Sequence, residues 1–169
     1  MAEPKKVNVV PIDETESPGL YKIMRSLIDK HHGHLVGARI VLVWNYGWSE
    51  DADGRLVLGK AKKASDLDAA LGEYDFAISL NHEAVNAKEW SEAQTKALID
   101  HELCHCDVTK DDAGEVKQDE TGRTVYRIRK HDIEEFGEVV ARHGLYKSDL
   151  VKFAETIREA KKLPLLKVS

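Results

Sequence analysis

The feature that most constrains this chain is a helical pattern at residues 91–106, SEAQTKALIDHELCHC. Three apolar side chains, Ile99, Leu103 and Cys106, recur at helical spacing and share one face. A helix with such a face must be anchored in a core. The rest of the chain must therefore supply a packed layer that covers this face.

Two histidines stand four residues apart on the same helix, with a glutamate directly after the first. Four residues turn a helix by about 400°, so His101 and His105 fall on nearly one face. Two imidazoles so placed can bind one zinc ion, and Glu102 beside them suits a general base for a metal-bound water. The alternative is a helix with two solvated histidines. The apolar flanks disfavour it, because unpaired histidines in a largely buried helix are costly.

A catalytic zinc ion keeps three protein ligands and one water, so a third ligand must come from elsewhere. His131 is favoured, because it directly precedes a helix whose expected N-cap is Asp132. Glu134 and Glu135 are the carboxylate alternatives, although Glu135 is also explained as the capping-box partner of that helix. Asp111 is a further alternative, but the glycine that a metzincin-type turn requires before it is missing.

Other histidines and the two cysteines receive simpler explanations. The run HHGH at residues 31–34 suggests a second metal site, but polar residues are common at a helix C-terminus, and we favour that explanation. Cys104 is interpreted as a packing residue. Because Cys104 and Cys106 point in different directions on a helix, they cannot easily bridge each other. The chain is therefore expected to be free of disulfides and cytoplasmic.

Length and charge restrict the class of protein. A chain of 169 residues suits one domain with a single core. The net charge of −5 does not indicate a nucleic-acid binder, although local lysine and arginine clusters leave that partner possible. No run approaches the roughly 18 apolar residues that span a bilayer, and the start lacks a signal-peptide core. We therefore expect no membrane association.

Strands are expected early and helices late, which indicates an α+β fold. The expected segments are a helix at 17–33, strands at 38–47 and 74–81, the second arm of a hairpin at 55–65, a short turn or helix at 67–73, the helix at 91–106, a loop at 107–124, a short strand at 124–129, and helices at 132–144 and 148–161. A flexible lead-in (1–16), a single domain (17–162) and a C-terminal tail (163–169) complete the layout.

Two motifs together resemble a known family. The segment ISLNHEAVNAKEW…ALIDHELCH, followed later by HDIEEF, resembles the SprT-like zinc metallopeptidases and is most similar to the putative phage metallopeptidases. The resemblance covers roughly residues 37–145. It implies a minimal zincin-like domain, with a small mixed sheet packed on an N-terminal helix and the HExxH helix, and a helical C-terminus. It further implies zinc held by His101, His105 and His131, with Glu102 as base.

The expected function follows from these residues and this resemblance. The chain is expected to be a zinc-dependent metallopeptidase that hydrolyses a protein or peptide substrate through a zinc-bound water. An exposed strand edge beside the HExxH helix could pair with an extended peptide, main chain to main chain. The alternative is a catalytically silent zincin-like module with structural zinc, which binds protein or nucleic acid. A cytoplasmic location in a bacterial or phage-infected cell is expected, and the oligomeric state is left open.

Overall fold

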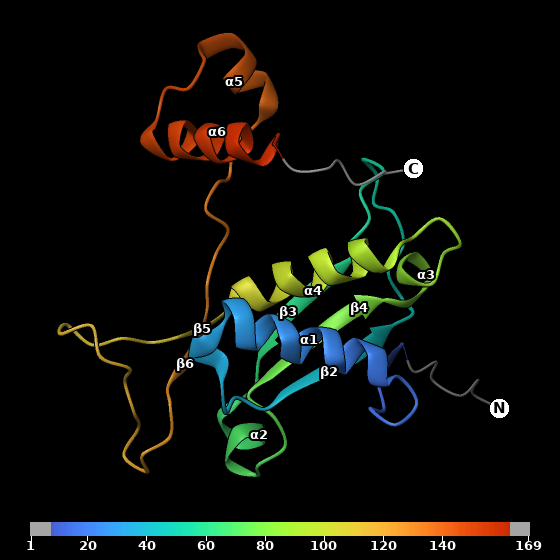
Figure 1. The fold of residues 1–169 in the computed structure, drawn as a ribbon, viewed down its shortest axis with the longest axis vertical. Coiled ribbons are helices and arrows are strands. Elements are labelled where there is room, and N and C mark those ends of the chain that lie inside the picture. Colours follow the sequence, from blue (N-terminus) through green and yellow to red (C-terminus); the bar gives the residue numbers. More distant parts are fainter. Residues whose placement is uncertain (1–7, 163–169) are drawn as a thin grey trace. The chain divides into compact units, whose positions relative to one another are not determined.

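The computed structural model describes residues 8–162 of the chain. They divide into two compact units, one ending at Arg129 and one beginning at Lys130 (Figure 1). The first unit contains β1 (Val9–Pro11), α1 (Pro18–His31), a short 3-10 helix (Gly33–Leu35), β2 (Ile40–Asn45), β3 (Gly59–Lys63), α2 (Asp66–Ala70), β4 (Phe76–Asn81), α3 (His82–Val85), α4 (Glu92–His105), β5 (Cys106–Val108) and β6 (Tyr126–Ile128). The second contains α5 (Gly137–His143) and α6 (Ser148–Ala160). The division falls inside the range 17–162, which was expected to form one domain.

Four strands form a mixed sheet in the order β1-β2-β4-β3. β2 and β4 are parallel, whereas β1 and β3 are antiparallel to their neighbours and form the two edges. The hairpin expected between residues 38–47 and 55–65 is therefore wrong, because β4 lies between β2 and β3. The apolar strands β2 and β4 take the centre, and β3, GKAKK, carries the lysines that suit an exposed edge. The small mixed sheet and the α+β class are confirmed.

Part of the expected flexible lead-in belongs to the sheet. Residues 9–11 form β1, and Ile12 directly after them is only 5% exposed. The backbone N–H of Ile12 donates to the Leu42 carbonyl at 2.9 Å, and the Tyr21 hydroxyl donates to the Ile12 carbonyl at 3.0 Å. Pro11 fits the end of an edge strand because it has no N–H group to pair. These contacts fasten β1 and Ile12 to β2 and α1.

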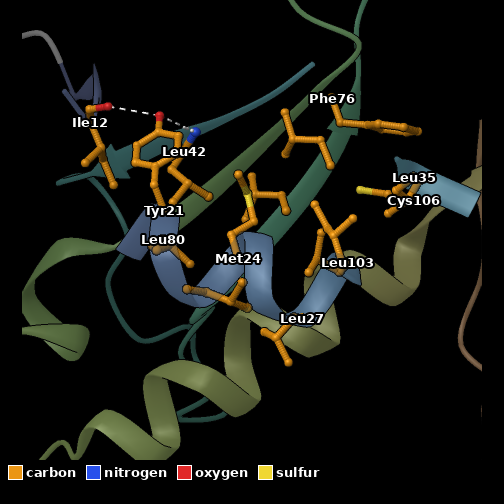
Figure 2. Close-up of a cluster of buried hydrophobic side chains, with 14 residues drawn as sticks. Ile12, Tyr21, Met24, Leu27, Leu35, Leu42, Phe76, Leu80, Leu103 and Cys106 are labelled. Atoms are coloured by element: carbon orange, nitrogen blue, oxygen red, sulfur yellow. Dashed lines mark hydrogen bonds between the residues drawn. The ribbon is translucent and has the colours of Figure 1, made fainter. Parts of the chain in front are cut away.

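The core lies between the sheet and two helices, α1 and α4, which run side by side across one face of the sheet (Figure 1). Figure 2 shows the buried side chains of this layer. From β4, Phe76, Ile78 and Leu80 have no exposed surface. From α4, Ile99 and Leu103 are equally buried. The predicted anchoring of the HELCH helix in the core is thus confirmed.

The start of α4 is capped by its own side chains. The Ser91 hydroxyl accepts from the Gln94 N–H at 3.2 Å, and the Gln94 side chain accepts from the Ser91 N–H at 2.9 Å. This reciprocal capping box satisfies two N–H groups that the helix itself leaves unpaired. Strong local signals thus define the helix that carries the two histidines.

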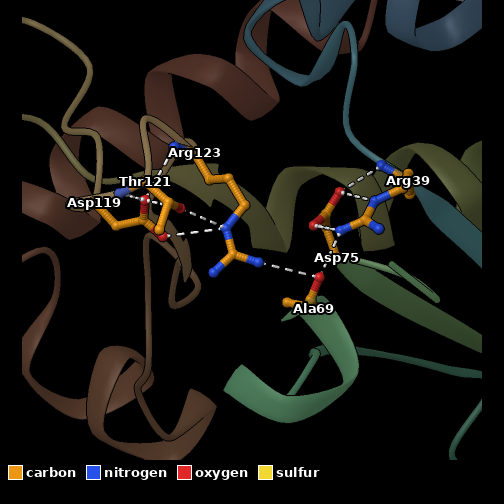
Figure 3. A network of polar contacts seen from close by, with 6 residues as sticks. All are labelled: Arg39, Ala69, Asp75, Asp119, Thr121 and Arg123. Atoms are coloured by element: carbon orange, nitrogen blue, oxygen red, sulfur yellow. Dashed lines mark hydrogen bonds and ion pairs between the residues drawn. The ribbon is translucent and has the colours of Figure 1, made fainter. Parts of the chain in front are cut away.

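The segment between β5 and β6 extends as an irregular hairpin that is fastened to α2 through a polar network (Figure 3). The Arg123 guanidinium donates to the Ala69 carbonyl at 3.3 Å. Beside it, Arg39 pairs with Asp75 through Nη2–Oδ1 and Nε–Oδ2 contacts of 2.7 and 3.1 Å. Burial alone would raise the pKa of Asp75, but the hydrogen bonds from Arg39 outweigh it, and the pKa is lowered. The carboxylate therefore stays ionised where the strands meet α2.

In the second unit, the helix predicted to begin at Asp132 begins later. Residues 131–136 are not helical, and α5 begins at Gly137 rather than at Asp132. Glu135 does not turn back to cap a helix, because its carboxylate accepts from the Tyr146 hydroxyl and lies 2.9 Å from Lys147 Nζ. The Tyr146 hydrogen bond is the largest of the causes that lower the pKa of Glu135 to about 2. The last helix, expected at 148–161, is confirmed as α6.

Candidate metal centre

The histidine pair lies one turn apart in the last turns of α4. The ring centroids of His101 and His105 are 5.1 Å apart, and a ring nitrogen of each lies within 4.8 Å of the other. His101 is exposed and His105 is half-buried. Because the opposite face of α4 is packed into the core, the pair is held on a rigid element, as a precise ligand set requires.

Backbone contacts fix the orientation of His105. Its Nδ1 lies 2.7 Å from the Arg129 carbonyl oxygen, and the Arg129 N–H donates to the His105 carbonyl at 2.8 Å. A carbonyl oxygen can only accept, so Nδ1 carries a proton, and in the neutral ring Nε2 then carries the lone pair. Metal-binding histidines are commonly oriented by a carbonyl in this way. The geometry of His105 therefore fits a ligand that binds through Nε2.

Glu102 is buried between α4 and β3, with only 3% of its surface exposed. Its carboxylate lies so close to Gly59 that a Cβ atom added there would stand 2.6 Å from Oε1. Burial raises the pKa of Glu102, while the charge of His105 and the N–H of Ala61 lower it, and the net pKa is raised. A carboxylate in this setting is a stronger base than a solvated one.

The strand beside Glu102 is an edge strand with a defined hydrogen-bonding side. At each end of β3, an even-numbered residue is hydrogen-bonded to the chain of β4 or the residue next to it. The Asn81 N–H donates to the Leu58 carbonyl at 2.8 Å, and the Ala64 N–H donates to the Asp75 carbonyl at 2.8 Å. In an antiparallel pair the bonding side alternates along the strand. The N–H and C=O groups of the odd-numbered residues, Ala61 among them, therefore point away from β4. This outer edge adjoins the carboxylate of Glu102.

The other predicted ligands lie in different surroundings. Asp111 is exposed, and its Oδ1 accepts from the N–H groups of two residues of its own turn at 2.9 Å. Glu134 is exposed, and Glu135 is engaged by Tyr146 and Lys147. His131, Glu134 and Glu135 all belong to the second unit. The identity of the third ligand therefore stays a prediction.

A further group of ligand-type side chains was not predicted as a set, although the run at residues 31–34, which contains His32, was considered as a second metal site and set aside. His32, Asp100 and Cys104 each offer an atom within 4.8 Å of the others. The interpretation of Cys104 as a packing residue is wrong, because its side chain lies on the exposed side of α4. The signal was present in the sequence, since Asp100 and Cys104 have the same four-residue spacing as the two histidines.

An α+β fold whose histidine-bearing helix packs against the edge strand of a small mixed sheet defines a zincin-like class of domain. A family model described as putative phage metallopeptidase matches residues 12–161, so the chain belongs to that family. This confirms the similarity to the putative phage metallopeptidases that DHELCH and HDIEEF indicated. Family membership implies a metal ion, and the histidine pair offers nitrogens that could bind one. Searches of curated proteins and of solved structures found no match.

The helices of residues 8–162 are short or polar compared with membrane-spanning helices. None of the helices in this range combines the length and the apolar character that a bilayer span requires.

Proposed function

We propose that this chain is a zinc-dependent peptidase in which Glu102 acts as the general base. The observation that carries the proposal is the position of the Glu102 carboxylate, buried between the helix with the histidine pair and the edge strand β3. A structural zinc site is closed by protein ligands and has no use for a base beside it. A buried, basic carboxylate at this position therefore favours a hydrolytic site over a structural zinc site.

The proposed ligands are His101, His105 and His131. The connectivity of the chain supports the third ligand, His131. Arg129 is joined to His105 by two hydrogen bonds of 2.7 and 2.8 Å. His131 follows two residues later, and two residues span at most about 7 Å even when fully extended. The chain thus passes directly from a ligand of α4 to His131. Three imidazole nitrogens form a ligand set that zinc accepts.

The chemistry divides between the metal and the protein. A bound zinc ion supplies Lewis acidity and lowers the pKa of water. Glu102 takes the proton from the water as the water attacks the peptide carbonyl, and it then passes the proton to the leaving nitrogen. The Ala61 N–H and the packing against Gly59 hold the carboxylate in place during both transfers.

The proposed substrate is an extended segment of protein. Such a segment can add to the outer edge of β3 by main-chain hydrogen bonds to the odd-numbered residues of that strand, except at the Ala61 N–H, which already binds Glu102. It would then pass directly beside Glu102. Main-chain pairing needs an unfolded stretch, so disordered or denatured proteins are the expected substrates. β3 is the edge strand of the sheet on this side, next to β4.

Removal of the metal tests the proposal directly. A chelator is expected to abolish cleavage of a denatured test protein, and added Zn²⁺ is expected to restore it, because the remaining residues supply no Lewis acid. Cleavage is followed by the release of labelled peptides, with zinc content measured on the same samples. Cleavage by fully metal-free protein would contradict the proposal. Zinc-loaded protein that cleaves none of many unfolded substrates would favour the silent binding module.

Gly59→Ala is expected to lower cleavage by about 10²-fold, because a displacement of a catalytic group by about 1 Å can cost that much. The added Cβ would stand 2.6 Å from Glu102 Oε1 and must push the carboxylate aside. Zinc content should be retained, because the three atoms nearest to the added Cβ all belong to Glu102 and none to a proposed ligand. Melting curves of both variants check that they are folded. The matched control is Gly19→Ala, where an added Cβ meets no atom within 4 Å. Equal activity in both variants would show that Gly59 does not position the base.

A further inference from the structure

A second group of ligand-type side chains lies where the end of α1 meets α4. His32 follows α1, and Asp100 and Cys104 lie one turn apart on α4. One ligand atom of each lies within 4.8 Å of the other two. His32 is only 6% exposed, and its Nε2 lies 2.6 Å from Asp100 Oδ1. A buried imidazole is thus aimed at a carboxylate, with a thiol beside both.

These side chains line a groove of about 480 Å³, together with His34 and Arg127. Asp100 and Cys104 each directly precede one histidine of the first pair along α4. One residue turns a helix by about 100°, so the two groups look out from neighbouring faces of the same two turns. The second group is therefore a distinct set of donors that shares the helix with the first.

We propose that His32, Asp100 and Cys104 form a second metal site, which binds Zn²⁺ or a similar thiophilic divalent ion. Thiolate, imidazole and carboxylate are all zinc ligands, and the thiolate selects for soft or borderline metals. On binding, Cys104 releases its thiol proton to solvent. The proton between His32 Nε2 and Asp100 leaves that position, so that the metal meets a neutral imidazole protonated at Nδ1. The site goes beyond the proposed peptidase function and does not depend on it.

Such a site would clamp two elements that pack against each other. His32 is joined to α1 by the hydrogen bond from its N–H to the Ile28 carbonyl, at 3.0 Å. Asp100 and Cys104 lie in the same turns of α4 as HELCH. Because a metal that binds only the folded chain adds its binding free energy to stability, the ion would fasten the catalytic helix to α1.

Cobalt titration of the full-length protein tests the second site. Co²⁺ bound by a thiolate gives a near-ultraviolet charge-transfer band, which histidines alone do not give. Wild-type protein is expected to show this band and to bind one more cobalt ion than Cys104→Ser, which should lose the band. His101→Ala/His105→Ala, which removes the first pair, should keep it. Cys106→Ser is the matched thiol control and should keep the band, because Cys106 is buried and burial raises the pKa of its thiol to about 12.

Three results would overturn this assignment. Wild-type protein could lack the band, the band could survive in Cys104→Ser, or it could vanish in the double histidine variant. The last result would place Cys104 in the first site. A further variant, Asp100→Asn, should weaken cobalt binding while retaining the band at saturation, whereas an unchanged affinity would remove Asp100 from the site. None of these spectra depends on peptide cleavage, so the second site can fail while the peptidase proposal stands.

Discussion

Glu102→Gln is expected to lower kcat for peptide cleavage by about 10²–10⁴-fold, the range that a positioned general base contributes. Glutamine has nearly the same size, and its carbonyl oxygen can still accept from the Ala61 N–H, so the fold and the bound zinc should remain. Zinc content and cleavage of a denatured protein are measured on the same preparation. Loss of cleavage with full zinc content would separate the base from the ligands.

The control for this variant is Glu92→Gln, which makes the same change at an exposed position in the first turn of α4. It should cleave as fast as wild-type protein. If Glu102→Gln also cleaves at the wild-type rate, the carboxylate is not the base, and the central claim about this site is wrong.

The same variant is expected to stabilise the metal-free protein. Burial is the main reason that the pKa of Glu102 is raised in the folded state. A group with a raised pKa stabilises the fold below its unfolded pKa, and this contribution is lost as the pH rises through the folded pKa. At neutral pH the buried charge therefore costs stability, and the neutral glutamine removes that cost. The melting temperature of metal-free Glu102→Gln should exceed that of wild type at neutral pH, and the difference should shrink in acid.

The local parts of this molecule were predictable from sequence. The capping box of Ser91 and Gln94 and the apolar face of α4 depend on contacts within four residues, so the sequence pattern determines them. The pairing of His101 with His105 is local for the same reason. The helix expected at Asp132 shows the limit of such patterns. Its capping sequence was present, but Tyr146 and Lys147 bind Glu135 instead.

The long-range parts were not predictable. No local pattern states that β3 pairs with β4 rather than with β2, because sheet order depends on which strands are buried on both sides. The contact between His32 and Asp100 joins residues 68 positions apart. Likewise, Glu102 meets Gly59 only because the edge strand folds back beside α4. The sequence therefore indicated the residue types of the site, whereas their partners required the tertiary structure.

Among the candidate third ligands, only His131→Ala is expected to abolish tight zinc binding at the first site. Loss of a direct ligand should exceed the 10–100-fold weakening that loss of an outer partner costs, by roughly another factor of ten. Glu134→Ala and Glu135→Ala should retain zinc. Glu135 in particular is held by Tyr146 and Lys147, and these contacts lower its pKa to about 2, so binding a metal would require breaking them.

The measurement must count one site only, because zinc at Cys104 would mask a loss at the histidines. The variants are therefore made in a Cys104→Ser background, and zinc affinity is measured by competition with a chelating dye. Asp111→Ala serves as a control, since its Oδ1 already accepts two backbone hydrogen bonds in an exposed turn. If His131→Ala keeps full affinity while Glu134→Ala or Glu135→Ala loses it, the third ligand is a carboxylate. The site would then resemble the gluzincin arrangement, in which two histidines and a glutamate hold the ion.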